Sequence, residues 1–209
     1  MTFILHLVYT TLMKTKIRGR PKTFDETEAL TAAMNYFWEH GYDNTSLDNL
    51  LLTMNIKKSS FYATFKSKEE IFSRALIAYR EQNLIFLETL KKEIGPKQTL
   101  LALLFHTLDE LNTLGKVKGC LLINSGKECY NKYPELSHQV KIEFNVFINL
   151  FTQLVKEAQE LGEISKKKEA HIIAGRYMNT LNGLIVTIQA GAKQDLINDL
   201  VENLKEILE

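Results

Sequence analysis

The sequence has few cysteines, almost no net charge and no apolar run long enough to cross a membrane. Its two cysteines, Cys120 and Cys129, are expected to be free thiols of a cytoplasmic chain rather than a structural disulfide. The formal net charge is only +1, so attraction to an anionic partner must come from local clusters of cations. The most apolar stretch, residues 1–12, is far shorter than the roughly 20 residues that span a bilayer, and its cations follow it instead of preceding it as in a secretory signal. We therefore expect neither export nor a membrane partner.

Motifs of the common catalytic and metal sites are missing as well. The sequence contains no H-E-x-x-H, no glycine-rich phosphate loop, no G-x-S-x-G and no cysteine paired with a nearby helical histidine. A metal sensor built from His106, Cys120, Cys129 and His138 is conceivable, but none of these residues has the short C-x-x-C or H-x-x-x-H spacing that metal sites favour. We expect a protein that is not an enzyme and that carries no cofactor and no metal.

Helical periodicity is present throughout, and no strand pattern appears. The 209 residues with 45% hydrophobic content can hold two helical domains that share one long connecting helix. Asp25 and Glu28 mark a first helix start, and Gly41 ends that helix. Further helices are expected at residues 69–93, 97–112, 135–161, 166–190 and 193–208, the first of them closed by Gly95-Pro96. The predicted fold class is all-α.

The segment from residue 45 to residue 71 carries the most specific pattern. Thr45 and Asp48 fit a capping box that starts a helix. An apolar stripe at i, i+3, i+4 and i+7 follows, formed by Leu47, Leu50, Leu51 and Met54. Asn55 comes where the stripe ends, and asparagine tolerates the left-handed backbone that a tight turn between two helices requires. The pattern predicts a helix-turn-helix.

A second short helix, residues 57–65, and a third helix start complete this pattern. Phe61 and Phe65 can pack inward, which leaves Lys58, Ser59, Ser60, Tyr62 and Thr64 on the outer face. Ser67 and Glu70 fit another capping box, and Lys66 and Lys68 beside it could neutralise phosphates. An ordinary helical hairpin domain with solvated lysines fits the same spacing.

Residues 19–79 resemble the DNA-binding domain of the TetR-type (AcrR-like) bacterial transcriptional regulators. The resemblance rests on the T-S opening of the first helix, the S-x-Y core of the second and the F-x-S-K-E exit. Two departures are Asn55, where the family usually has glycine, and Asp48, an acid near the DNA face. The resemblance implies that residues 57–64 form the recognition helix and that the partner is a double-stranded DNA operator. The expected DNA-binding residues are Thr45, Ser46, Lys57, Lys58, Ser59, Ser60, Tyr62, Thr64, Lys66 and Lys68.

The family pattern also implies a domain order and a homodimer. We expect an N-terminal extension at residues 1–22, a helix-turn-helix domain at residues 23–70 and an effector-binding and dimerisation domain at residues 71–209. In the family the two last helices pack against those of a second copy. The apolar stripes that would do so here include Ile173, Leu181, Leu184, Ile188, Leu200 and Leu204, and Gly175 and Gly183 would permit a close approach. Core packing within one chain fits the same stripes.

The extension holds two features that need separate interpretations. Lys14, Lys16, Arg18, Arg20 and Lys22 bring five cations and no acid into nine residues, which could track phosphates or enter a minor groove, or form a flexible solvated tail. For the apolar residues before it we prefer Met13 as the natural start, with a disordered apolar tail as the alternative.

An effector pocket is implied by the resemblance, but pocket walls and cores use the same residue types. Candidate wall residues, for which ordinary core packing is the alternative, are Phe105, Leu108, Cys120, Leu122, Phe144, Phe147, Phe151, Tyr177 and Met178. GCLLINSGKE, residues 119–128, is similar to a G-C-L-x-x-N signature of a branch that includes electrophile and redox sensors. Lys116, Lys118 and Lys127 could lower the pKa of Cys120, although a buried cysteine that serves as a small hydrophobe remains the alternative.

These observations predict a homodimeric, ligand-responsive repressor on an inverted-repeat operator. Its effector would be a small molecule acting through the connecting helix at residues 71–79. Two alternatives stay open: a thiol or electrophile sensor that uses Cys120, and a helical adaptor or DNA-architectural protein without a ligand switch.

Overall fold

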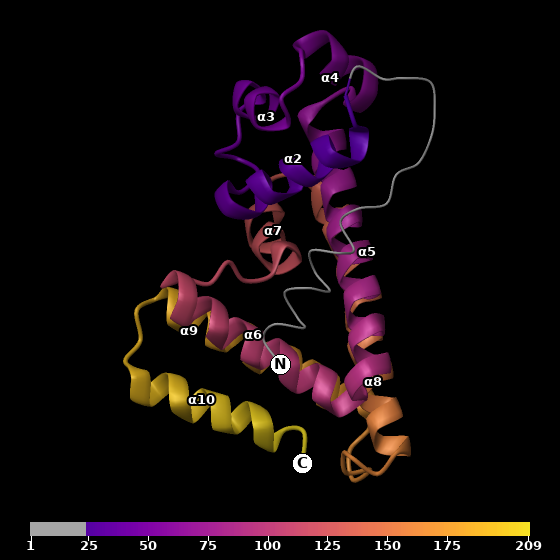
Figure 1. The fold of residues 1–209 in the computed structure, drawn as a ribbon, viewed down its shortest axis with the longest axis vertical. Helices are drawn as coiled ribbons and strands as arrows, with labels where there is room; N and C mark the ends of the chain where they lie inside the picture. The colour runs from indigo at the N-terminus through magenta and orange to yellow at the C-terminus, as the bar shows by residue number, and fades with distance from the viewer. Residues whose placement is uncertain (1–23) are drawn as a thin grey trace. The chain divides into compact units, whose positions relative to one another are not determined.

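The computed structural model describes residues 24–209. The apolar start, Met13 and the basic tail lie outside the described residues, as does the predicted domain at residues 1–22. All regular secondary structure in the described part is helical, which confirms the all-α fold class (Figure 1). The helices are α2 (Glu26–His40), α3 (Leu47–Met54), α4 (Lys58–Phe65), α5 (Lys68–Ile94), α6 (Pro96–Leu114), α7 (Leu121–Cys129), α8 (Pro134–Glu160), α9 (Ala170–Gln189) and α10 (Gln194–Glu206). None of these helices is both long and apolar enough to cross a membrane.

The chain divides into two compact units, each made of two or more separate stretches. One unit contains residues 24–83 and 120–144, and the other contains residues 84–119 and 145–209. The long helices α5 and α8 therefore contribute to both units. The predicted division at residue 70 follows the order of the sequence, whereas the compact units do not, and we keep that division as a proposal.

The unit with residues 24–83 has an aromatic core. Met34, Phe37, Phe61, Phe65 and Ile71 have at most 1% of their surface exposed. The rings of Phe37 and Phe72 meet edge to face with centroids 4.8 Å apart, a geometry that adds to the burial of their area. In α3 the fully buried leucine is Leu50, while Leu47 and Leu51 are half-buried. This core fixes α2, α3 and α4 around the first turns of α5 (Figure 1).

Helices α2 and α3 both start at a residue whose side chain caps the helix, but the cap of α3 differs from the predicted one. The Asp25 carboxylate accepts the N–H groups of Thr27 and Glu28 at 2.8 and 3.2 Å, as expected for the start of α2. The predicted capping box of Thr45 and Asp48 is wrong by one residue, because Ser46 is the N-cap of α3 and its Oγ accepts the Asn49 N–H at 3.1 Å. The Thr45 hydroxyl is turned inward and donates to the Gly41 carbonyl at 2.6 Å.

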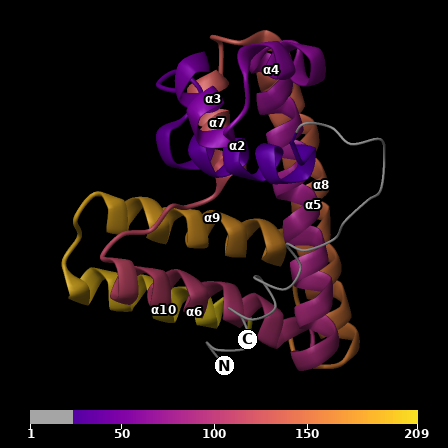
Figure 2. The ribbon, with the colours of Figure 1, turned by 45° about the horizontal axis from the view of Figure 1, so that its top comes forward.

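The other unit joins α6, α9 and α10 with the C-terminal parts of α5 and α8. Helices α9 and α10 pack directly on each other, and the two ribbon views agree on this pairing (Figure 2). The buried Tyr177 of α9 donates its hydroxyl to the Leu100 carbonyl of α6 at 2.5 Å. Burial raises the pKa of this phenol, so the hydroxyl stays a donor at any physiological pH.

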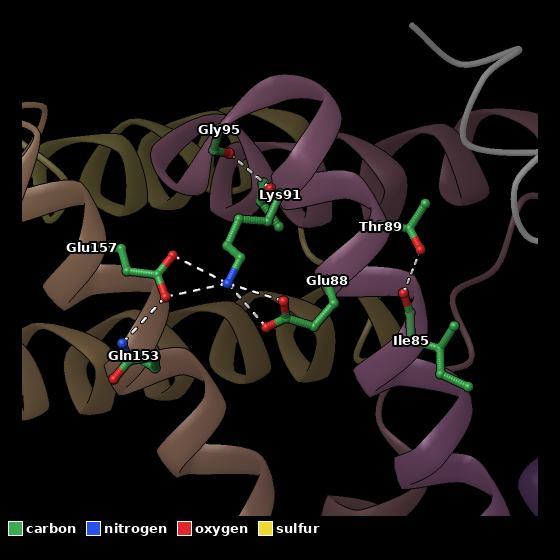
Figure 3. Close-up of polar contacts among 8 residues, drawn as sticks. Ile85, Glu88, Thr89, Lys91, Gly95, Gln153 and Glu157 are labelled. Atoms are coloured by element: carbon green, nitrogen blue, oxygen red, sulfur yellow. Dashed lines mark hydrogen bonds and ion pairs between the residues drawn. The ribbon is translucent and has the colours of Figure 1, made fainter.

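An ion pair joins α5 to α8 inside this unit (Figure 3). Lys91 Nζ lies 3.0 Å from a Glu88 carboxylate oxygen and 3.1 Å from one of Glu157, and the Gln153 amide donates to Glu157 at 3.2 Å. Burial alone would lower the pKa of Lys91, but the hydrogen bonds to Glu88 and Glu157 outweigh it and raise the pKa. The cation therefore stays charged between two carboxylates.

Candidate nucleic-acid interface

Helices α3 and α4 are joined by a three-residue turn. Asn55 follows α3 with φ 52° and ψ 47°, the left-handed conformation predicted for it. The Ile56 N–H donates to the Leu51 carbonyl at 3.1 Å, which satisfies an end carbonyl of α3. The chain then enters α4 after Lys57. The helix-turn-helix predicted from the sequence is thus present.

Helix α4 has one apolar and one polar face. Phe61 and Phe65 are fully buried, with ring centroids 5.7 Å apart. Lys58, Ser59 and Tyr62 are exposed on the other face, and Tyr62 rests edge-on against Phe61 with 48% of its surface in solvent. Because the buried aromatic residues fix the rotation of α4, the polar residues are presented outward.

The N-terminal end of α4 is also suited to bind an anion. Its N-cap, Lys57, makes no side-chain capping bond, and the first turn contains no acidic residue. Neither a side-chain cap at Lys57 nor an acid in the first turn therefore neutralises the leading N–H groups and the positive end of the helix dipole. Together with the exposed Lys57 and Lys58, this end of α4 can receive a backbone phosphate.

The remaining predicted DNA-binding residues differ in exposure. Ser46 and Lys66 are exposed, and Ser60 and Thr64 are half-buried. Thr45 has no exposed surface, and we correct its role from DNA contact to support of the turn before α3. Lys68 is half-buried with its Nζ 4.2 Å from the centroid of the Tyr42 ring, and this burial lowers its pKa.

Arg74 supports this interface and carries no sequence signal. It lies on α5, donates to Glu26 Oε1 at 2.5 Å and places its guanidinium 4.8 Å from the centroid of the Phe65 ring. The end of α4 is thereby tied to the start of α2. Its acidic partner is 48 residues away in the sequence, and only the folded chain brings the two together.

The predicted effector residues are divided between the two compact units. Phe151 lies 5.1 Å from Phe147 and 6.0 Å from Tyr177, measured between ring centroids, and all three are buried. Met178 is also buried, Leu108 is half-buried and Phe105 is 40% exposed, whereas Cys120, Leu122 and Phe144 belong to the unit with α7. A hollow of about 520 Å³ lies elsewhere, at the loop before α9 and the end of α10. Its lining residues are Ile164, Ser165, Lys167, Lys168, Ile173, Arg176, Asn203, Glu206, Ile207 and Glu209.

The thiol of Cys120 is less acidic than the sequence suggested. Burial raises its pKa and outweighs the opposing effect of hydrogen bonds with the Ile123 backbone and the Tyr79 side chain. The prediction that the nearby lysines lower this pKa is therefore wrong. Cys129 is buried at the end of α7, which raises its pKa to about 11, and both cysteines are free. In the described part of the chain, no three His, Cys, Asp or Glu side chains gather to hold a metal ion.

The residues predicted for the dimer interface are mostly used within one chain. Ile173, Leu184, Ile188 and Leu204 are buried, and Leu181 and Leu200 are half-buried. The apolar residues exposed on α9 and α10 are others, namely Ile172, Val186 and Leu196. Among the described residues, no atom other than those of the adjoining helix backbone and neighbouring residues lies within 4 Å of the position that a Cβ would take at Gly175 or Gly183. Packing within the chain thus accounts for the four buried residues, and a different strip of α9 and α10 is open.

Comparisons with known proteins address the same region and the whole fold. Residues 29–75, which include α3 and α4, match a family described as bacterial regulatory proteins, tetR family. The chain is 27% identical over 193 residues to the uncharacterized HTH-type transcriptional regulator YezE of Bacillus subtilis, covering 91% of this chain and 100% of YezE. It is 28% identical over 184 residues to the HTH-type transcriptional repressor ComR of Escherichia coli, covering 85% of each. A solved structure of a cysteine mutant of the TetR-family regulator CifR with 26-base-pair operator DNA matches with a TM-score of 0.72 at 25% identity, covering 91% of this chain and 98% of CifR.

Proposed function

We propose that this chain, as a member of the TetR family of DNA-binding transcriptional regulators, is a repressor. It binds an inverted-repeat operator as a homodimer and leaves the operator when a small molecule binds. The observation that carries the proposal is the outward polar and basic face of α4, held in place by buried Phe61 and Phe65. The similarity to the repressor ComR, which extends over most of its length, supports repression rather than activation. The complex of CifR with operator DNA supports an operator as the target.

The homodimer is supported by the open strip on the last two helices. Ile172 and Val186 of α9 and Leu196 of α10 are exposed, and Gly175 and Gly183 leave room for the backbone of a second helix. A symmetric dimer places the same strip of both copies in contact. Two recognition helices about 34 to 36 Å apart would then read half-sites one DNA turn apart.

The response to a ligand is proposed to be a shift between two arrangements of the recognition helices. An effector that moves the population from 99:1 to 1:99 must bind one state better by roughly 5.5 kcal/mol. A small molecule is favoured over a thiol electrophile, because burial raises the pKa of Cys120 and leaves little reactive thiolate at neutral pH.

The proposal is tested with duplex DNA that the purified protein selects from a random library at a stated salt concentration. We expect the selected sites to contain an inverted repeat and to bind two chains each, as measured by light scattering of the complex. Binding of one chain to a site without symmetry would contradict the dimeric operator. Tight binding that no metabolite in a broad panel releases would favour the architectural alternative.

A further inference from the structure

A carboxylate from α7 holds the turn that precedes the helix-turn-helix. Glu128 accepts the Tyr42 N–H through Oε2 and the Asp43 N–H through Oε1, both at 2.8 Å. Successive backbone N–H groups in a turn can form an anion-binding concavity, and residues 42 and 43 lie in such a turn directly after Gly41, whose φ is 79°. Hydrogen bonds to an ionised carboxylate are about twice as strong as neutral ones.

The same turn reaches back to the segment after α7. The Asp43 carboxylate accepts hydrogen bonds from Lys132 Nζ and the Tyr133 hydroxyl, and these bonds lower the pKa of Asp43. The Tyr42 ring meets the Tyr133 ring edge to face at 4.9 Å. The contact is therefore reciprocal: residues 128–133 bind both the backbone and the side chains of residues 42 and 43.

The position of this turn sets where α3 begins. The Thr45 hydroxyl donates to the Gly41 carbonyl at 2.6 Å, and the Thr45 N–H donates to the Tyr42 carbonyl at 3.3 Å. Ser46, the next residue, is the N-cap of α3. A Cβ at Gly41 would lie 3.0 Å from both Glu128 oxygens, so the carboxylate approaches the backbone closely only because residue 41 is glycine.

We propose that Glu128 is a positioning residue for DNA binding, an inference that rests on the function proposed above. It touches no DNA, and it fixes the turn at residues 41–43 so that α3 and α4 present their outer faces in the orientation that a specific DNA site requires. Loss of the carboxylate frees two backbone N–H groups and lets the start of α3 shift. Specific DNA binding then falls more than nonspecific binding, because phosphate contacts tolerate misorientation better than base contacts do.

The test compares Glu128→Ala and Glu128→Gln with the control Glu135→Gln. The control removes the same charge from an exposed position in the first turn of α8. Each protein is titrated with the duplex that the wild-type protein selects from a random library and with a scrambled duplex, at one salt concentration, and its melting temperature is recorded. We expect the ratio of specific to nonspecific affinity to fall at least about tenfold for Glu128→Ala, with scrambled-duplex affinity changed less than about twofold and the control unchanged.

Glu128→Gln keeps the shape of the side chain but turns an NH₂ group toward one of the two backbone N–H groups, so its ratio should also fall. This variant decides the outcome if Glu128→Ala is unfolded at the assay temperature. A lower melting temperature with an unchanged affinity ratio in the folded protein would mean that Glu128 supports only stability, and it would overturn the proposal.

Discussion

Single residues decide the local geometry of the interface through partners that are distant in sequence. Glycine at residue 41 is required both by its φ of 79° and by the carboxylate of Glu128 against it. Thr45 is turned inward because its hydroxyl donates to the Gly41 carbonyl. Ser46, the next residue, is therefore the N-cap of α3.

Gly41→Ala should destabilise the protein by about 1–3 kcal/mol, since alanine is strained at positive φ and its Cβ would meet Glu128. Gly95→Ala is the matched control, because Gly95 has φ 83° and ψ 165°, close to the 79° and 174° of Gly41, and a Cβ there would make only an ordinary contact of 3.7 Å with Glu163. Urea unfolding measures both. Equal losses for the two variants would show that the contact with Glu128 adds nothing to the backbone strain.

Both cysteines should react slowly in the folded protein, because burial raises their pKa values and leaves the protonated thiol. At pH 7.5, iodoacetamide should label them at least about tenfold more slowly than in the urea-unfolded chain, whose thiols have a pKa of about 8.5. The native rate should rise only at pH values above those at which the unfolded thiols ionise. Single Cys120→Ser and Cys129→Ser variants assign the signals, and rapid native labelling of Cys120 at pH 7.5 would restore the electrophile-sensor alternative.

At the scale of elements, local sequence signals predicted the helices well. The spacing of apolar residues indicated α3, α4 and the long α5, and Asn55 marked the turn. What local patterns could not supply was the side of each helix that meets a particular neighbour. Ile173, Leu184, Ile188 and Leu204 form stripes that fit either a core or an interface, and only their burial within the chain distinguishes the two. Arg74 and Glu128 carry no motif, because their partners are 48 and 86 residues away.

The turn between α3 and α4 gives a prediction at this scale. Asn55→Ala should lower the free energy of unfolding by about 1 kcal/mol. The left-handed backbone conformation is sterically unfavourable for alanine, whose side chain cannot form the local hydrogen bonds that help asparagine adopt it. Asn55→Gly should be neutral or slightly stabilising, since glycine adopts this conformation freely. Urea unfolding of the pair checks this. A loss for glycine as large as that for alanine would mean that the Asn55 side chain, not its backbone conformation, stabilises the turn.

At the scale of the whole molecule, the two compact units and the proposed dimer are the features that the sequence order conceals. Residues 120–144 belong with the N-terminal helices although a sequence-based division places them in the second domain. The strip proposed for the dimer consists of apolar residues of α9 and α10 that stay exposed in the single chain.

Val186→Asp should therefore convert the proposed dimer to a monomer without unfolding it, because Val186 is 47% exposed in the single chain and a carboxylate there would be buried without a partner only in the dimer. Val146→Asp is the control, an exposed apolar residue on α8. Light scattering reports the mass and circular dichroism the fold. A dimer that survives Val186→Asp would place the interface elsewhere.

The central claim is that the outer face of α4 binds DNA. The salt dependence of DNA affinity for Lys58→Ala tests it most directly. The control is Lys92→Ala, since Lys92 is an exposed lysine in the last turn of α5. Loss of one phosphate contact should weaken binding to the selected duplex roughly three- to tenfold and reduce the slope of log affinity against log salt by about 1. The Lys92→Ala control and the mass of the free protein should not change. An affinity and a salt slope for Lys58→Ala that both equal those of the wild-type protein would contradict the assignment of α4 as the DNA-binding helix.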